Sequence, residues 1–428
     1  MNLTIHRGTK EIGGSCVELK SANTRILIDF GMPLVGADKK PFDSNILKGK
    51  TVAELKSLKI LPDISGLYEN EEKTVDAILI SHSHLDHYGF LHRINKNIPI
   101  YMSRGCKDLI SIAYYFGQTQ YDPRNAKAVP SWETFKIGDM EITPYLVDHS
   151  AFDAFAYLVE TDKKRLFYSG DFRRHGRKGV LFENQIKKPP KNIDVLVVEG
   201  TMLSRDGDNS QNTEEAICGQ LVKEFKQADD LILISVSSQN IDRLVSIYIA
   251  CSKAGKIFVV SPYTAYILEQ LKRKGITLPQ FDWTGIKVYF AQSSHTRKLA
   301  EDKSLFKYKS AKITCEEIEA QRGNVVVLDS YYVRNKFAKK GLLKGATLIY
   351  SQWEGYLEGA EGFWEENDVS IKKIHTSGHV FLEDLKVFIK ALNPGKIIPI
   401  HTFAAEKFRE YWGDKVMMID DGEEIEIF

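Results

Sequence analysis

The chain has 428 residues, of which 43% are hydrophobic and 27% charged, and its formal net charge is +1. A chain of this length is longer than one hydrophobic core usually accommodates, so we expect a soluble globular protein with two domains. The near-neutral net charge excludes a global electrostatic field that attracts polyanions. The five cysteines are scattered without a CxxC pair, so we expect reduced thiols. The sequence has neither an N-terminal apolar stretch nor an apolar run of about 18 residues, so we expect a cytoplasmic protein with no membrane partner.

Short apolar runs in the first half of the chain predict β-strands. They include RILIDFG, VDAILIS, RLFYSGD and IDVLVVEG. Several of these runs end directly in histidine, aspartate or glutamate. Since the carboxyl ends of strands are a common place for active sites in α/β proteins, the sequence predicts a functional site there.

The segment SHSHLDHYG (81–89) follows one of these strands and contains three histidines and an aspartate. His82 and His84 are two residues apart, so extended backbone can point both side chains the same way. Asp86 and His87 follow where we expect the chain to turn into a helix over YGFLHRI. Imidazole and carboxylate are ligands of zinc, manganese and iron. The alternative is a polar loop with a helix-capping aspartate, which this density of ligand-type residues disfavours.

Other strand ends supply further candidate ligands. Apolar runs lead into His149, Asp171, His375, His379 and His401. Taken singly, each histidine is compatible with a hydrogen-bonded structural role. Taken together with the 81–89 segment, they predict a site for two metal ions that share a bridging carboxylate.

The pattern changes near residue 205. Residues 204–215 are polar, and they predict a linker followed by a helix that Asn212 or Thr213 caps. Helical and strand-like segments then alternate, which predicts a parallel sheet with helices on both faces. After about residue 365 the strand-ending histidines return. We therefore expect an inserted domain over 206–364 within a first domain made of 1–205 and 365–428.

The motifs resemble a known family. HSHLDHYG, DHS (148–150) and SGDF (169–172) resemble the signature of the metallo-β-lactamase fold, and GTKEIGGSCVEL, SSQNIDRL and HTSGHVFLEDLK are similar to ribonuclease J and its β-CASP relatives. The resemblance implies an αββα sandwich interrupted by a Rossmann-like β-CASP domain. It also implies a metal-dependent ribonuclease, exonuclease from the 5′ end or endonuclease, that attacks the phosphodiester with a hydroxide bridging two metals.

Roles for individual residues follow from the resemblance. It implies two Zn²⁺ ions per chain, with Mn²⁺ as the alternative. The implied metal ligands are His82, His84 and His149 for one ion, Asp86, His87 and His401 for the other, and Asp171 as the bridge. The implied catalytic residues are Asp86, Asp171, Glu199 and His379.

Contacts to substrate are implied at two turns. The residues are Ser238, Asn240, Arg243, His375, Ser377 and Gly378, for which a helix cap, a strand-end residue or a tight turn are the structural alternatives. RNA is the expected partner and single-stranded DNA the alternative, and a homo-oligomer is compatible with the sequence. A DNA nuclease of the same fold, a small-molecule metallohydrolase and a scaffold subunit are the competing functions. A scaffold subunit would have a degenerate metal site, whereas every predicted ligand position in this sequence holds a residue that can bind a metal.

Overall fold

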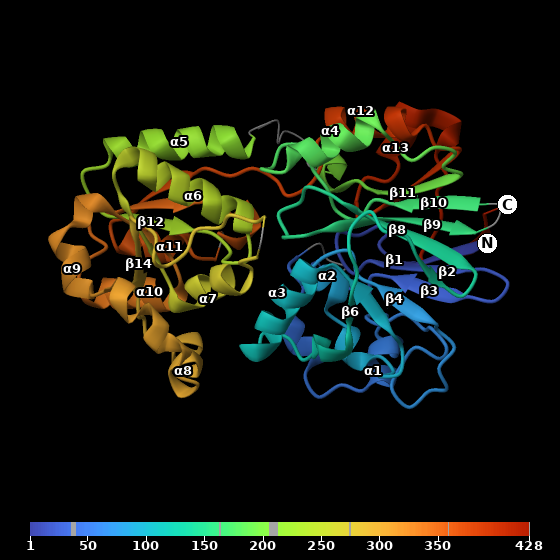
Figure 1. The fold of residues 1–428 in the computed structure, drawn as a ribbon, viewed down its shortest axis with the longest axis horizontal. Helices are drawn as coiled ribbons and strands as arrows, with labels where there is room; N and C mark the ends of the chain where they lie inside the picture. The colour runs from blue at the N-terminus through green and yellow to red at the C-terminus, as the bar shows by residue number, and fades with distance from the viewer. Residues whose placement is uncertain (36–39, 162–163, 205–212, 274, 358, 428) are drawn as a thin grey trace. The chain divides into compact units, whose positions relative to one another are not determined.

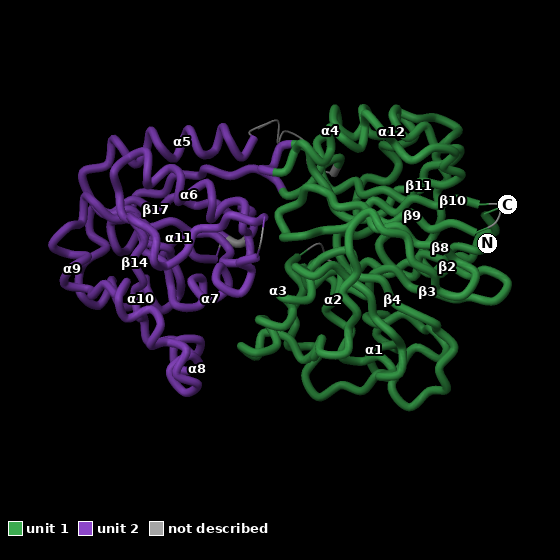
Figure 2. The backbone as a smooth tube through the Cα atoms, viewed as in Figure 1, with its two compact units in different colours: residues 1–174, 178–209, 378–428 green, residues 175–177, 210–377 purple. Residues whose placement is uncertain are grey.

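The computed structural model describes residues 1–35, 40–161, 164–204, 213–273, 275–357 and 359–427. The chain divides into two compact units (Figure 2). Unit 1 comprises Met1–Arg174, Lys178–Asn209 and Gly378–Phe428, and unit 2 comprises His175–Arg177 and Ser210–Ser377. The predicted domain boundary at 205/206 lies outside the described residues. The other predicted boundary, at 364/365, lies within unit 2, because β18 (Ser370–Lys373) pairs in parallel with β17 (Thr347–Tyr350).

Unit 1 is built on two β-sheets (Figure 1). The first has the order β20 (Glu424–Glu426), β1 (Asn2–Arg7), β2 (Cys16–Lys20), β3 (Arg25–Ile28), β4 (Ala77–Leu79), β5 (Ile100–Met102), β6 (Lys127–Ala128). The second has the order β19 (Lys396–Ile400), β11 (Val195–Glu199), β10 (Lys164–Tyr168), β9 (Phe155–Thr161), β8 (Met140–Leu146), β7 (Phe135–Ile137). In the second sheet β10, β11 and β19 are parallel, so their carboxyl ends meet at one edge.

The two sheets of unit 1 are the inner layers of a four-layer sandwich. One hydrophobic cluster joins residues of both sheets, for example Ile28 of β3 with Val197 of β11. Alternate residues of the same strands, such as Leu27 and Leu196, belong to two outer clusters instead. Side chains on successive strand residues point to opposite faces, so these strands need cover on both sides. Helices α1 (Val52–Ser57), α2 (Leu85–Tyr88) and α3 (Arg104–Tyr115) accompany the first sheet, and α4 (Gly179–Lys187), α12 (Leu382–Leu392) and α13 (Lys407–Trp412) the second.

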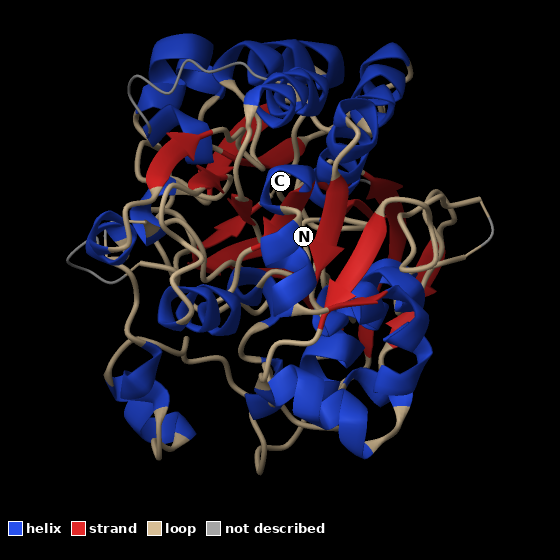
Figure 3. Cartoon of the chain, turned by 90° about the vertical axis from the view of Figure 1, so that its left-hand side faces the viewer, coloured by secondary structure: helices blue, strands red, loops and turns tan. Residues whose placement is uncertain are grey.

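Unit 2 is an α/β unit with one parallel sheet. Its order is β15 (Lys312–Ile313), β14 (Ile286–Tyr289), β13 (Ile257–Val260), β16 (Val325–Leu328), β12 (Ile232–Ser235), β17, β18. The connecting helices, labelled in Figure 1, are α5 (Glu214–Gln227), α6 (Ile241–Ala254), α7 (Pro262–Gln270), α8 (Ser294–Glu301), α9 (Cys315–Ala320), α10 (Tyr331–Lys339) and α11 (Glu361–Glu366). Figure 3 draws the helices of the chain in blue and its strands in red. Thr213 caps α5 through the amide of Ala216, which confirms one of the two predicted caps.

The state of the cysteines and the length of the helices both bear on predictions from composition. All five cysteines are free and buried, as expected of reduced thiols. Over the described ranges, no helix combines the length and the apolar character that crossing a bilayer requires.

A buried carboxylate in the first sheet gives unit 1 a predictable acid sensitivity. Burial alone would raise the pKa of Glu18, but hydrogen bonds from His6 and Arg25 overcome this and lower it to about 2. A carboxyl group whose pKa falls on folding stabilises the protein above its unfolded pKa, and that stabilisation disappears as the pH drops.

We expect Glu18→Gln to lower the free energy of unfolding at pH 7 by about 2–3 kcal/mol. The difference from the wild type should shrink between pH 4.5 and pH 2, where the wild-type carboxylate becomes protonated. Urea unfolding across this pH range measures it, with Glu141→Gln, an exposed partner of Lys136, as the control. A difference that does not change with pH would show that Glu18 acts through packing instead.

Candidate metal centre

Histidine and acidic side chains gather in unit 1, where β4, β10, β11 and β19 end and lead into loops. They form three groups, two of which share Asp171 and His401, and within each group the possible ligand atoms lie within 4.8 Å of one another. The groups are His82, His84 and His149; Asp86, His87, Asp171 and His401; and Asp171, Glu199, His379 and His401. The structure thus brings the seven predicted ligands together with Glu199 and His379.

The segment after β4 contributes four of these residues through a change from extended to helical backbone. His84 has extended dihedral angles and precedes the single turn of α2, which carries Asp86 and His87. The prediction of a helix over YGFLHRI was wrong in its position. Helix α2 begins earlier, at Leu85, and only a 3-10 turn at Leu91–Arg93 follows it. Because α2 starts earlier, the aspartate and the third histidine project from helical backbone and the first two histidines from extended backbone.

Three neutral imidazoles form the first group. His84 Nδ1 lies 3.2 Å from His82 Nε2 and 3.2 Å from His149 Nε2. Ligand atoms of a tetrahedral zinc site with bonds of about 2.0–2.1 Å are separated by about 3.3–3.4 Å. Burial lowers the pKa of all three histidines. Their rings therefore stay uncharged, which is the form that binds a metal.

Four of the histidines are oriented by a second partner. Each has a partner at Nδ1, so Nε2 is left to face the cluster. These pairs are His82 with Ser81 Oγ at 3.0 Å, His87 with Asp29 Oδ2 at 2.8 Å, His149 with the Gly378 carbonyl at 2.7 Å, and His401 with Thr201 Oγ1 at 2.9 Å. This arrangement fixes the orientation of the four rings.

Asp171 lies at the centre of the cluster. Its Oδ2 is near the imidazole nitrogens of five histidines: His87 at 3.2 Å, His82 and His379 at 3.7 Å, His401 at 3.9 Å and His149 at 4.0 Å. Among the described residues, neither Asp171 Oδ2 nor His87 Nε2 has a hydrogen-bond partner of acceptable geometry, although both atoms are buried. A buried polar atom without a partner costs about 1–3 kcal/mol. A divalent cation would satisfy both, so the donor set fits a metal site.

Electrostatics keep the acidic ligands ionised. Burial would raise the pKa of Asp86 and of Asp171, but the neighbouring imidazoles of His87 and His401 overcome this and hold both well below the ordinary value. Both carboxylates are therefore charged near neutral pH and available to a cation.

Two residues at strand ends adopt left-handed backbone conformations, Asp29 with φ of 62° and His401 with φ of 55°. Non-glycine residues in this region are strained and are concentrated at functional sites. In His401 the conformation accompanies a contact of 3.1 Å between Nε2 and Asp86 Oδ2.

At Gly31 a side chain is impossible, because a Cβ atom there would lie 1.6 Å from the carbonyl oxygen of Asp86.

Asp29 is a functional residue that the sequence analysis missed. Its carboxylate is fully buried and accepts hydrogen bonds from the Ser81 amide and hydroxyl, from Tyr168 and from His87 Nδ1. The available signal was its place in ILIDFG, an aspartate that ends an apolar strand just as Asp171 follows another. Asp29 orients the cluster through His87 and is not itself in any of the three groups.

Glu199 and His379 form a pair at one side of the cluster. The Glu199 carboxylate accepts hydrogen bonds from the amides of Phe172 and Thr201, and its Oε2 lies 3.1 Å from His379 Nδ1. The Thr201 hydroxyl is 3.2 Å from the same His379 nitrogen. Glu199 is buried, whereas 18% of the His379 side chain is exposed. His379 is thus held in place and is still open to a substrate.

The residues predicted at the SSQNIDRL turn lie in unit 2 and have internal partners. The Ser238 hydroxyl lies 2.8 Å from that of Thr264, and the Asn240 side chain caps α6. Arg243 is completely buried, with its guanidinium bound to the Glu214 carboxylate. We therefore interpret Arg243 as a residue that fixes the start of α6, because a buried ion pair is costly to break.

The residues predicted at the HTSGH turn are divided between the units. His375 and Ser377 belong to unit 2, where the Ser377 carbonyl accepts a hydrogen bond from His175. Gly378 belongs to unit 1, and its carbonyl holds His149. The role of Gly378 seen in the structure is therefore the orientation of a candidate ligand.

The chain is similar in sequence to several known proteins. Residues 64–228 match the model of the β-lactamase superfamily domain. The chain is 23% identical over 392 residues to ribonuclease J2 of Bacillus subtilis, covering 86% of this chain and 67% of that protein. It is 23% identical over 412 residues to ribonuclease J of Mycoplasma genitalium, covering 92% and 66%. The chain thus spans about two thirds of the length of these relatives.

Another protein and a solved structure are also similar to this chain. An RNase J-like protein of Methanocaldococcus jannaschii is 26% identical over 279 residues, covering 61% of this chain and 58% of that protein. The crystal structure of a protein of unknown function from Enterococcus faecalis superposes with a TM-score of 0.81 at 21% identity and covers 99% of both chains. At this identity the structural match concerns the fold alone.

Proposed function

We propose that this chain is a metal-dependent ribonuclease that hydrolyses phosphodiester bonds of RNA. The match of residues 64–228 to the β-lactamase superfamily domain and the similarity of most of the chain to ribonuclease J proteins support this. The observation that supports this most is the buried cluster around Asp171, in which the neutral imidazoles of His82, His84 and His149 lie beside ionised carboxylates. A scaffold protein has no need of buried charges held in this way.

The cluster is suited to two divalent cations, zinc or alternatively manganese. His82, His84 and His149 would hold one ion. Asp86, His87 and His401 would hold the other, with the Asp171 carboxylate shared between them. When bound, such a pair of ions lowers the pKa of water and neutralises the negative charge of a phosphate group.

His379 is the residue that we assign to the leaving oxygen. A departing alkoxide is a poor leaving group, and a general acid that protonates it removes this obstacle. His379, like His84, is a partly exposed histidine of the cluster, and Glu199 fixes its ring through Nδ1. Glu199 therefore acts through His379 and not on the substrate.

We expect His379→Ala to lower kcat by about 10²–10⁴-fold, the usual contribution of a positioned general acid. The metal content should stay at the wild-type level, since the other candidate ligands remain. Glu199→Gln should lower kcat less, because the glutamine side chain keeps a hydrogen-bond partner near His379 Nδ1. Metal analysis together with single-turnover kinetics makes the measurement, and His295→Ala in unit 2 is the control. Loss of metal in parallel with activity would instead make His379 a ligand, as its place beside Asp171 and His401 permits.

End-labelled RNA tests the proposed function directly. Purified protein with measured metal content is incubated with single-stranded RNA and with single-stranded DNA of the same sequence, beside an Asp86→Ala/His87→Ala variant. Metal-dependent cleavage of RNA alone supports the proposal, and equal cleavage of DNA would remove the preference for RNA. If neither polymer is cleaved, the ribonuclease proposal fails and a small-molecule substrate becomes the better candidate. Product ladders from 5′-phosphorylated RNA distinguish exonuclease from endonuclease activity.

A further inference from the structure

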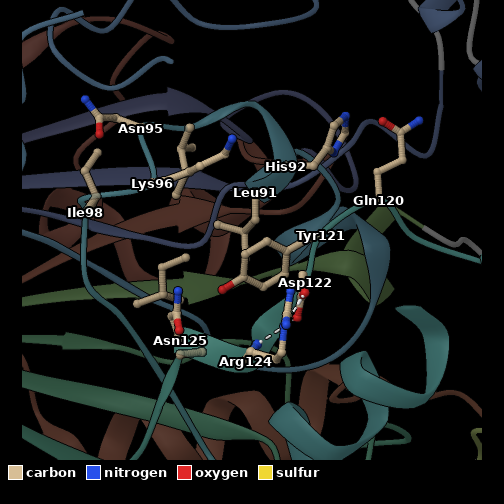
Figure 4. A pocket seen from close by; sticks show the side chains of 13 residues that line it. Leu91, His92, Asn95, Lys96, Ile98, Gln120, Tyr121, Asp122, Arg124 and Asn125 are labelled. Carbon is tan, nitrogen blue, oxygen red and sulfur yellow. Dashed lines mark hydrogen bonds and ion pairs between the residues drawn. The ribbon is translucent and has the colours of Figure 1, made fainter. Parts of the chain in front are cut away.

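Unit 1 contains a cavity of about 480 Å³ that is separate from the metal centre (Figure 4). Two segments line it, the stretch from Leu91 to Ile100 and the stretch from Gln120 to Ala126. None of its lining residues belongs to the three groups of candidate metal ligands. Its volume lies within the range of about 300–1,000 Å³ that is usual for small-molecule sites.

The inner wall of the cavity is apolar and rigid. Ile94, Ile98 and Ile100 are buried and belong to the hydrophobic cluster on the outer side of the first sheet. Tyr121 belongs to the same cluster, and its ring lies in the middle of the lining side chains in Figure 4. Side chains fixed by core packing give the cavity a preformed floor, of which only the edges are exposed.

Carboxamides occupy the more exposed part of the lining. Gln120 and Asn125 are exposed, and within the described part of the chain no hydrogen bond engages either side chain. Each offers both an acceptor and two donors, the combination that reads the edge of a nucleobase. Asn95 is already fixed, because its Nδ2 donates to the Glu71 carbonyl and its Oδ1 accepts from the Asn97 amide.

Histidine contributes no charge to this cavity. His92 has partners at both ring nitrogens, the Gly89 carbonyl at Nδ1 and Arg93 Nε at Nε2. Burial and the charge of Arg93 lower the pKa of His92 to about 4. The cationic groups of the lining are therefore Lys96 and Arg124.

Lys96 and Arg124 form only exposed ion pairs with other residues. The Lys96 side chain is 85% exposed and pairs with an exposed Glu69, and the Arg124 side chain is 84% exposed and pairs with Asp122. Exposed ion pairs contribute little to stability, so both cations can exchange their partners for a ligand anion. The Arg124 guanidinium also has the fork geometry that matches a phosphate group.

We propose that this cavity binds a nucleoside 5′-monophosphate unit. The base lies at Tyr121, Gln120 and Asn125 on opposite sides of that ring supply polar contacts (Figure 4), and the exposed cations Lys96 and Arg124 attract the phosphate. A free nucleotide and a nucleotide within an RNA strand present the same chemistry to these residues. The proposal goes beyond the ribonuclease activity, because binding here requires neither the metal centre nor cleavage.

Calorimetry with the full chain in the presence of a chelator tests the proposal, with adenosine monophosphate as the first probe and adenosine and inorganic phosphate as partial probes. Asn125→Trp places a large side chain at an exposed position of the lining, and Lys96→Ala/Arg124→Ala removes both cations. Each variant should weaken binding of adenosine monophosphate by about tenfold or more, as expected for the loss of charge-assisted contacts or of space. Lys136→Ala, an exposed lysine of the second sheet, is the matched control and should leave the affinity unchanged.

The same variants distinguish the two sources of the ligand. If they also weaken binding of a short 5′-phosphorylated oligoribonucleotide, the cavity holds a nucleotide of the strand. If only the mononucleotide is affected, it holds a free nucleotide. Absence of mononucleotide binding, or binding that Asn125→Trp leaves unchanged, would overturn the proposal, as would binding of inorganic phosphate with the same affinity as the nucleotide. RNA cleavage is measured separately, so a failure here is distinguishable from a failure of the ribonuclease proposal.

Discussion

Asp171→Ala is expected to abolish hydrolysis and to remove bound metal. Asp171 Oδ2 is the atom that five histidine rings surround, and no other described carboxylate belongs to both acidic groups of the cluster. We expect kcat/KM to fall by more than about 10³-fold, since this change exceeds the loss of a single transition-state donor. Metal analysis of the purified variant should show at most one ion, against the two that we propose for the wild type. Activity on end-labelled RNA and metal content are measured on the same preparations.

The interpretation depends on the variant remaining folded. Asp63→Ala removes a carboxylate from an exposed position of the same unit and serves as the control. Without metal, Asp171→Ala should unfold at a temperature close to that of the metal-free wild type, and added Zn²⁺ should stabilise the wild type alone. A protein that binds a ligand at 100 times its Kd gains about 2.7 kcal/mol. Full metal content in an inactive Asp171→Ala variant would contradict the bridging role.

The sequence was informative where a local rule determines position. Apolar strands followed by polar residues predicted that His82, Asp171 and His401 stand at strand ends, and the alternation of helix and strand predicted the parallel sheet of unit 2. These predictions need only the period of the hydrophobic pattern and the direction of the chain. The resemblance to β-CASP nucleases supplied the grouping of the ligands, which no local rule provides.

The remaining features depend on contacts between distant segments. Arg243 is buried because Glu214 meets it from another helix, and nothing in SSQNIDRL distinguishes that from an arginine that binds phosphate. The carbonyl of Gly378 reaches His149 across 229 positions of the sequence. The left-handed backbone of Asp29 and His401 is likewise a tertiary effect, since neither residue type favours it enough to be predicted.

Asp29→Asn is expected to weaken metal binding although Asp29 lies outside the ligand groups. In the wild type, Asp29 Oδ2 accepts from His87 Nδ1, Tyr168 and the Ser81 hydroxyl, and Oδ1 accepts from the Ser81 amide. An asparagine must turn its amino group towards at least one of these donors. In the Oδ2 position the amino group removes the acceptor that keeps the His87 proton on Nδ1. In the Oδ1 position it faces the Ser81 amide and leaves His87 only an uncharged, weaker acceptor. We expect metal affinity to fall by about 10–100-fold, as for other partners of metal ligands.

Stability and metal affinity must be separated, because the same substitution leaves a buried donor unsatisfied, which costs about 1–3 kcal/mol. Metal affinity is therefore measured by competition with a chelator under conditions where both proteins are folded. Asp76→Asn is the matched control, since Asp76 accepts a hydrogen bond from the Arg25 amide and touches no candidate ligand. If Asp29→Asn lowered stability but kept the wild-type metal affinity, Asp29 would be a structural residue only. If it lowers both, the orientation of His87 is set by the strand end that carries Asp29, and the metal centre depends on the packing of the first sheet as well as on its own ligands.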